Sequence, residues 1–101
     1  MPFVKVATLA EVPENSVIEV NLGNDCYAIC NVDGTISALG GVCVHQGGPL
    51  GQGNVEQGRV ICPWHAWEYD CRTGANIDDP STSVPVYPVK VEGSDILIQV
   101  P

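Results

Sequence analysis

The chain has 101 residues, of which four are basic and twelve acidic, so its net charge at pH 7 is −8. A chain of this length makes one domain with a modest core, and residues 1–101 are therefore taken as a single domain. Four basic side chains argue against nucleic acid or an anionic membrane surface as a partner. A basic protein surface suits this charge better, although the charge could serve solubility alone.

Alternation of apolar and polar residues predicts strands throughout the first forty residues. The expected strands cover residues 3–8, 16–22, 26–32 and 35–39, with the first at a sheet edge. Residues 9–15 form a turn segment broken by Pro13, and Gly23-Asn24 turns the chain again. Asp33-Gly34 is a strong hairpin signal because both residues tolerate a left-handed backbone.

Two long loops are expected in the second half. Residues 40–58 hold seven glycines and read mostly as loop, and residues 74–85 form a second loop. Short strands are expected at 59–61 and 66–70, and a final hairpin at 86–92 and 95–100. No helix of useful length is expected. The predicted fold class is all-β, a small antiparallel β sandwich or partial barrel whose loops at about residues 40–80 build a functional tip, because compact domains rarely keep long loops otherwise.

Both histidines of the chain stand beside cysteines. Cys43-Val44-His45 opens a first arm (residues 43–50), and sixteen residues later Cys62-Pro63-Trp64-His65 opens a second arm (residues 62–67). In each arm a thiol precedes an imidazole, which suits a two-iron cluster with two thiolates on one iron and two imidazoles on the other. Glycines such as Gly47 would let backbone N–H groups approach the sulfurs. A Cys₂His₂ set also binds structural zinc, and the spacing alone leaves that alternative open.

The arms also carry a family resemblance. Residues 43–50, Cys-Val-His-Gln-Gly-Gly-Pro-Leu, and residues 62–65, Cys-Pro-Trp-His, resemble the two cluster-binding boxes of Rieske 2Fe–2S proteins. Tyr69-Asp70, Thr73-Gly74 and Pro80 resemble the segment leading into that family's third, cluster-covering loop. Residues 86–93 look like the closing strand of soluble bacterial Rieske ferredoxins. The resemblance spans essentially the whole chain and implies the Rieske iron–sulfur fold with one 2Fe–2S cluster.

The resemblance assigns further roles around the cluster. Cys43, His45, Cys62 and His65 would be the ligands. Leu50 would cover the cluster, with an ordinary core leucine as the alternative. Of Trp64 and Trp67, one would shield the cluster and the other would pack in the core. Pro80 would close over the cluster, with a plain turn proline as the alternative.

Departures from the respiratory-chain Rieske pattern bear on the reduction potential. Those proteins form a disulfide at the positions of Gly48, or its neighbour, and Trp64, and they carry a serine at the position of Trp67. Tyr69 does match their tyrosine, which bonds a ligand sulfur. We therefore expect a potential in the lower part of the Rieske range of roughly −150 to +300 mV, raised somewhat by Tyr69.

The expected function is electron transfer without catalysis. If His45 and His65 bind the cluster, no histidine remains for a mononuclear iron site or a catalytic base. By resemblance, the partners are a flavin-dependent ferredoxin reductase and a terminal oxygenase, docked transiently in a multicomponent dioxygenase system. One alternative is a small subunit or regulatory module of a larger reductase such as nitrite reductase, and a second is a zinc-stabilised binding module.

Three cysteines remain outside the arms. Cys26 and Cys30 lie four positions apart in a predicted strand, so they share a face and are expected to be small core residues. Cys71 is expected to be incidental rather than a ligand, and its position after the second arm allows it to be exposed. The start of the chain shows no signal-peptide pattern and no apolar run is long enough to span a membrane, so we expect a cytoplasmic protein.

Overall fold

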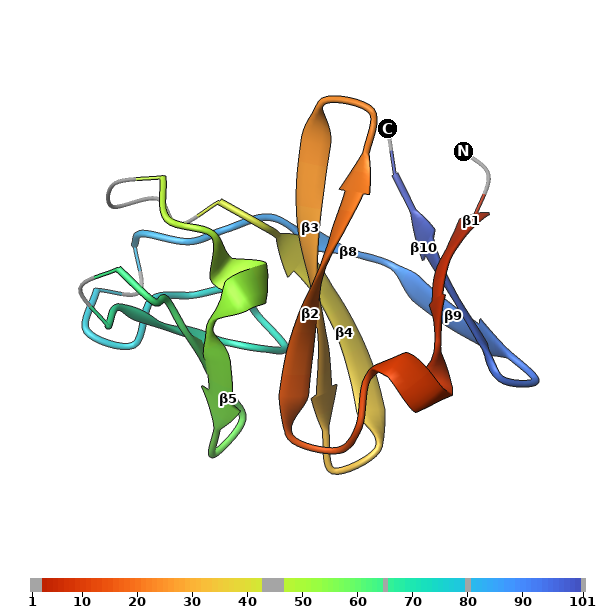
Figure 1. Cartoon of the computed structure of the whole chain (residues 1–101). Coiled ribbons are helices and arrows are strands. Elements are labelled where there is room, and N and C mark those ends of the chain that lie inside the picture. Colours follow the sequence, from red (N-terminus) through yellow and green to blue (C-terminus); the bar gives the residue numbers. More distant parts are fainter. Residues whose placement is uncertain (1–2, 43–46, 65, 80, 101) are drawn as a thin grey trace.

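The computed structural model describes residues 3–42, 47–64, 66–79 and 81–100. These residues form ten strands and two short 3-10 helices, arranged as three antiparallel sheets (Figure 1). The all-β prediction is therefore confirmed. Among the helices of these described ranges, none has the length and apolar character needed to cross a bilayer.

The central sheet has the order β2-β3-β4-β8. Its strands are β2 (Ser16–Leu22), β3 (Asp25–Val32), β4 (Thr35–Gly40) and β8 (Val86–Tyr87). The β3–β4 hairpin turns at Asp33 and Gly34, whose φ values are 51° and 94°. This pair of left-handed residues matches the right-handed twist of the strands, which is why the Asp-Gly signal predicted the hairpin correctly.

The two other sheets lie on either side of the central one (Figure 1). One has the order β1-β10-β9, and its strands are β1 (Phe3–Thr8), β10 (Asp95–Gln99) and β9 (Val89–Glu92). The other has the order β5-β6-β7, and its strands are β5 (Asn54–Glu56), β6 (Arg59–Ile61) and β7 (Glu68–Asp70). Strand β1 lies at a sheet edge, as predicted.

Strand β3 is the centre of the molecule because its two faces enter different cores. Ala28 and Cys30 pack in a first core shared with β5, β6 and β7, whereas Tyr27 and Ile29 pack in a second core shared with β1 and β10. A strand buried on both faces reads as a nearly continuous apolar run, and residues 26–30 are Cys-Tyr-Ala-Ile-Cys. The first core includes residues of both arms, Leu50 and Cys62, whereas the second core joins β3 to the β1-β10-β9 sheet.

Several predicted boundaries were wrong. The expected loop 40–58 contains the 3-10 helix η2 (Leu50–Gln52) and strand β5, and the expected turn at 9–15 begins with the 3-10 helix η1 (Leu9–Glu11). The expected strand 66–70 starts only at Glu68, because Ala66 has a left-handed φ of 56°. The expected strand 86–92 is divided at Pro88, where the chain leaves the central sheet and enters the β1-β10-β9 sheet. Proline lacks the N–H group that a continuous ladder needs.

Candidate metal centre

The first arm leaves the central sheet as a loop closed at its base. The N–H of Gly41 donates to the Cys26 carbonyl at 2.9 Å, and the N–H of Leu50 donates to the Gly41 carbonyl at 2.9 Å. Val42 and Pro49 form an isolated antiparallel bridge. The two ends of the arm are therefore held together beside β3.

The second arm connects β6 to β7 and is closed in the same way. The N–H of Cys62 donates to the Trp67 carbonyl at 2.8 Å. The β6–β7 ladder below this bond pairs Ile61 with Glu68, and Arg59 and Glu68 form an ion pair at 3.2 Å. Each arm is thus a short loop on a paired base, which is the kind of support that positions ligands.

The two arms meet at Gly48 and Cys62. A Cβ atom on Gly48 would lie 2.7 Å from the Sγ of Cys62 and 3.1 Å from the Cβ of Trp64. Only a residue without a side chain permits this approach, because real Cβ contacts are longer. Gly47, which precedes it, has a φ of 75° and is exposed, so glycine is required there for conformation.

The described site residues divide between core and surface. Leu50, Cys62 and Tyr69 are almost fully buried in the first core. Trp67 packs against that core, whereas Trp64 remains 49% exposed, so the structure decides which tryptophan packs inside. The burial of Leu50 suits both a cluster cover and an ordinary core leucine, and its covering role stays a prediction.

Four predicted site residues, Cys43, His45, His65 and Pro80, lie outside the described residues. The ligand set as a whole therefore stays a prediction. The described part of the site fits a cluster in its donor chemistry, because a buried thiol at Cys62 faces a position without a side chain at Gly48. The glycine brings backbone rather than a side chain against the Cys62 sulfur, and backbone N–H groups near a ligand sulfur help to tune such a site.

The other cysteines differ from their prediction in two cases. Cys71 is completely buried in the first core, although the sequence allowed it to be exposed. Its side chain shares a hydrogen bond with Cys30, and this bond together with burial raises the pKa of the Cys30 thiol, while the same bond lowers the pKa of Cys71. The bond links β3 to the end of the β7 strand. The prediction that Cys30 is a core residue is confirmed.

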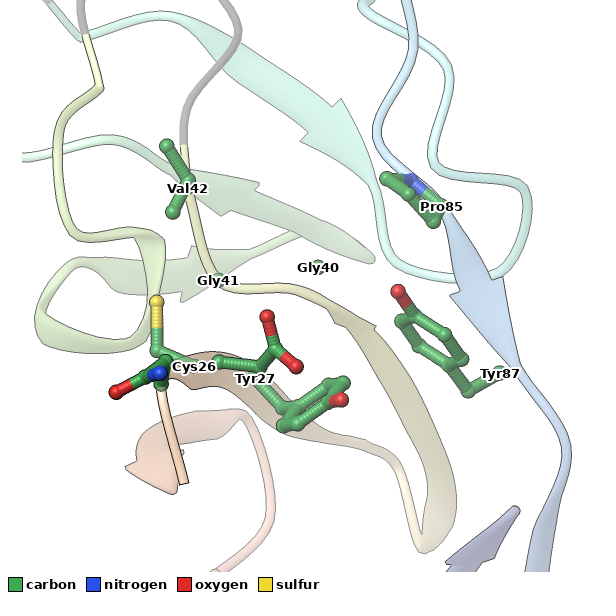
Figure 2. Close-up of a pocket in the computed structure, with 9 residues that line it drawn as sticks. Cys26, Tyr27, Gly40, Gly41, Val42, Pro85 and Tyr87 are labelled. Atoms are coloured by element: carbon green, nitrogen blue, oxygen red, sulfur yellow. The ribbon is translucent and has the colours of Figure 1, made fainter. Parts of the chain in front are cut away.

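Cys26 is only half-buried, so its prediction as a core residue was wrong. It lines a pocket of ≈ 340 Å³ next to the start of the first arm (Figure 2). Figure 2 shows Cys26 and Val42 on one side of the pocket, Pro85 and Tyr87 on the other, and Gly41 and Gly40 between them. The rings of Tyr27 and Tyr87 pack edge to face with centroids 5.1 Å apart. Cys26 is the second residue of β3 and lies beside this pocket, whereas Cys30 lies in the middle of the strand inside the first core.

The residues that shape the loop after β7 were not among the predicted site residues. Asn76 is buried with 4% exposure, and its side-chain oxygen accepts hydrogen bonds from the N–H groups of Asp78 and Asp79, both at 2.9 Å. The signal was present as Asn76-Ile77-Asp78-Asp79 before a proline, since asparagine and aspartate favour such turns.

Comparison with known proteins agrees with this architecture. Residues 2–88 match the family described as the Rieske [2Fe-2S] domain. The chain is 31% identical to the ferredoxin component of the naphthalene 1,2-dioxygenase system of Pseudomonas aeruginosa, over 95% of this chain and 93% of that protein. It is 33% identical to the biphenyl dioxygenase ferredoxin subunit of Pseudomonas sp. strain KKS102, over 97% and 92% of the two chains.

Solved structures show the same similarity. The ferredoxin of carbazole 1,9a-dioxygenase from Nocardioides aromaticivorans IC177 superposes with a TM-score of 0.86, at 25% identity and 97% coverage of both chains. A nitrite reductase small subunit from Mycobacterium tuberculosis, at 24% identity, shares the fold alone. The family match spans most of the chain, and the cofactor that this family implies is one 2Fe–2S cluster. The chain therefore belongs to the Rieske [2Fe-2S] domain family.

Proposed function

We propose that this protein is a one-electron carrier that receives an electron from a flavin-dependent ferredoxin reductase and delivers it to a terminal oxygenase. The observation that carries the proposal is the match over nearly the full length of ferredoxin components of dioxygenase systems. When bound, a Rieske cluster takes up and releases one electron.

The chain's own residues would hold the cluster at the meeting point of the arms. Cys43 and Cys62 would bind as thiolates and His45 and His65 as neutral imidazoles. The burial of Cys62, Leu50 and Tyr69 supports a dry sulfur side of the site, because water is excluded around all three described residues. Low solvent access around sulfur is one of the factors that set the potential of such sites.

The surface beside the arms would dock the partners. Val42 and Trp64, which flank the predicted ligands in sequence, are 51% and 49% exposed. The net charge of −8 would guide the protein toward a basic partner surface. The side chains of Val42 and Trp64 would then make the short-lived contact. Transient electron-transfer contacts are small, so a few exposed apolar residues suffice. The proposed location of this exchange is the cytoplasm.

Metal analysis and electron paramagnetic resonance test the cluster. Protein purified without oxygen should contain two irons and two inorganic sulfides per chain, appear red-brown and give a rhombic signal on reduction. His45→Ala and His65→Ala should lose the colour, whereas Cys71→Ser should keep it. Stoichiometric zinc without iron would favour the zinc-stabilised module instead.

Stopped-flow reduction tests the carrier role. The protein should be reduced by a flavin-dependent reductase with NADH and re-oxidised by a terminal oxygenase with its substrate. Both second-order rates should fall as salt is raised, because exposed charges are screened. Co-purification with a sirohaem-containing large subunit, together with no exchange with any oxygenase, would instead indicate a reductase small subunit.

A further inference from the structure

Two buried cysteines outside the arms lie against each other in the first core. Cys30 belongs to β3, and Cys71 directly follows the last residue of β7. Neither side chain has solvent exposure, neither sulfur is in a disulfide, and the two side chains share a hydrogen bond. The proposed electron-carrier function gives no task to either thiol. A buried pair of nucleophilic groups in contact therefore remains to be explained.

The backbone around the pair keeps β3 and the end of β7 side by side. The N–H of Cys71 donates to the carbonyl of Gly58, in the turn between β5 and β6, at 3.0 Å. A Cβ atom on Gly58 would lie 3.9 Å from the Cγ1 of Val32. Val32 follows Cys30 by two positions, so their side chains share one face of β3, and Val32 packs against the first core. The contact between the two thiols is therefore supported by the packing of three neighbouring segments.

The hydrogen bond makes the two thiols chemically unequal. The bond and burial raise the pKa of Cys30, which is the donor. The same bond lowers the pKa of Cys71, against the opposing effects of burial and of the Asp70 carboxylate. Because the thiolate is the nucleophilic form of cysteine, Cys71 is the better suited of the two to attack an oxidant. Cys30, which is held in contact with it, is placed to react second.

An open cleft brings small molecules close to the pair. Its volume is ≈ 470 Å³, and its lining includes Asp70 and Arg72, the two neighbours of Cys71 in sequence. Val32 and Gly58, which connect Cys71 to β3, line the same cleft. The thiols lie behind these residues, so a molecule of the size of water needs only a small local opening to reach them. The same wall excludes larger reagents.

We propose that Cys30 and Cys71 form a redox-active dithiol, which hydrogen peroxide converts to a disulfide between β3 and the end of β7. The inference goes beyond the electron-carrier function and does not depend on it. It assigns a modification site to two residues that bind no metal in the predicted ligand set. The co-reactant is a hydroperoxide small enough to pass the wall of the cleft.

The oxidation has two steps and consumes one molecule of hydrogen peroxide. In the first step the thiolate of Cys71 attacks one oxygen, and an S–O bond forms as the O–O bond breaks. The released hydroxide takes up a proton to give water, and Cys71 is left as a sulfenic acid. In the second step the sulfur of Cys30 attacks the sulfenic sulfur, and an S–S bond forms as the S–O bond breaks. The thiol proton of Cys30 leaves with the hydroxyl group as a second water, and two electrons in total pass from the sulfurs to the peroxide.

The disulfide would close a covalent loop around both arms, because residues 30–71 contain them. A cross-link across about forty residues removes much of the freedom of the unfolded chain and so favours the folded state. In a reducing compartment the pair stays as two thiols, which is the form in this structure, and the disulfide forms only when peroxide is present. Oxidation would therefore tighten the part of the chain that carries the predicted ligands.

Peptide mapping tests whether the cross-link forms. Iron-loaded protein carrying Cys26→Ser, which removes the half-buried thiol, is treated with a small excess of hydrogen peroxide. Free thiols are then blocked with iodoacetamide in denaturant, and the peptides are analysed by mass spectrometry without reduction. We expect one cross-linked species that joins the Cys30 and Cys71 peptides and disappears with dithiothreitol. Recovery of both cysteines as alkylated thiols from protein that keeps its iron would overturn the proposal, as would cross-links that contain Cys62 instead.

The melting temperature tests the consequence for the fold. It should rise by about 10 °C when the disulfide forms and return when the disulfide is reduced. An unchanged melting temperature despite a complete cross-link would overturn the tightening of the chain around the arms.

Serine variants separate the roles of the two sulfurs. In Cys30→Ser the second step is blocked, so dimedone added with the denaturant should label Cys71 as a sulfenic acid. In Cys71→Ser the nucleophile is absent, so Cys30 should be recovered as a thiol. Dimedone on Cys30 in the second variant, with none on Cys71 in the first, would overturn the assigned order. The peptide map of protein that keeps both cysteines needs neither variant, so the proposal stays testable if one of them does not fold.

Discussion

A Cβ atom on Gly48 would lie 2.7 Å from the Sγ of Cys62, so the two arms are in contact at these two residues. Gly48 belongs to the arm that begins with Cys43, and Cys62 is a predicted ligand of the other arm. The contact joins two chain segments that the sequence separates by fourteen positions.

Gly48→Ala should therefore disturb the metal centre directly. The added methyl group must displace the Cys62 sulfur or Trp64, and overpacking of this kind typically costs about 1–3 kcal/mol. We expect reduced iron and sulfide content and a shifted paramagnetic resonance spectrum in the fraction that keeps its cluster.

Gly51→Ala is the matched control for crowding. Gly51 is buried, and all three of the atoms nearest to its Cβ would belong to Glu19, the Cα at 2.5 Å, whereas those at Gly48 belong to Cys62 and Trp64. It should lower the melting temperature without changing the spectrum. Identical spectra for wild type and Gly48→Ala would contradict the placement of the cluster beside Cys62.

Tyr69→Phe should lower the midpoint potential. Tyr69 is fully buried in the same core as Cys62. The family resemblance predicts that its hydroxyl donates to a ligand sulfur, and such a bond would stabilise the reduced state. A hydrogen bond worth about 0.5–1.5 kcal/mol corresponds to about 20–60 mV for one electron. Voltammetry of the purified protein measures the change.

Tyr27→Phe tests whether that shift is specific. Tyr27 is equally a buried tyrosine, with 4% exposure, but it lies in the second core. Its removal should affect stability and leave the potential where it is. A Tyr69→Phe protein with an unchanged midpoint would remove the proposed role of the hydroxyl.

Cys71→Ser should keep the cluster while weakening the fold. The serine hydroxyl can still share a hydrogen bond with Cys30, yet it carries a polar group into a site without solvent contact. We expect an unchanged iron content and a loss of about 1 kcal/mol in the free energy of unfolding, measured by denaturant titration. Loss of iron in this variant would mean that Cys71 supports the cluster more directly than its position indicates.

Alkylation of the intact, iron-loaded protein should occur at Cys26. Cys30 and Cys71 are buried, whereas Cys26 lines an open pocket. Burial, Glu19 and Asp25 raise the pKa of Cys26, so little thiolate exists at pH 7 and the rate with iodoacetamide should climb as the pH rises above about 8.5. Peptide mass spectrometry after labelling identifies the modified residue.

The Asp25→Asn variant tests whether the negative charge of Asp25 contributes to the raised pKa of Cys26. Removing this neighbouring carboxylate should lower the pKa of Cys26 and speed its alkylation at pH 7. Labelling of Cys30 or Cys71 while the iron content stays intact would show that the first core opens more readily than its burial indicates.

Many of the strands and one hairpin turn could be predicted from the sequence because their signals lie in neighbouring residues. The strands at 3–8, 16–22 and 35–39 follow from apolar–polar alternation, and the turn at Asp33-Gly34 follows from two residues that tolerate a left-handed backbone. The arms were recognisable because thiols and imidazoles at short spacing serve few purposes other than binding metal. Each of these signals lies within a few neighbouring residues.

Other boundaries depended on contacts that no short window contains. Residues 86–92 alternate like one strand, yet Pro88 divides them between two sheets because each half finds a different partner. The sequence allowed Cys71 to be exposed. The structure buries it in the first core, which also contains residues of β3. Trp64 and Trp67 are the same residue type three positions apart, so the sequence does not distinguish their roles. In the structure only Trp67 packs against that core.

The sequence by itself determined the family and the all-β character and predicted the donor atoms, since these depend on residue types and local spacing. Only the tertiary structure decided that Gly48 touches Cys62 and that Cys30 meets Cys71. The physical reason is that these pairs come from different loops and strands, and their meeting is set by how three sheets bury two cores around β3.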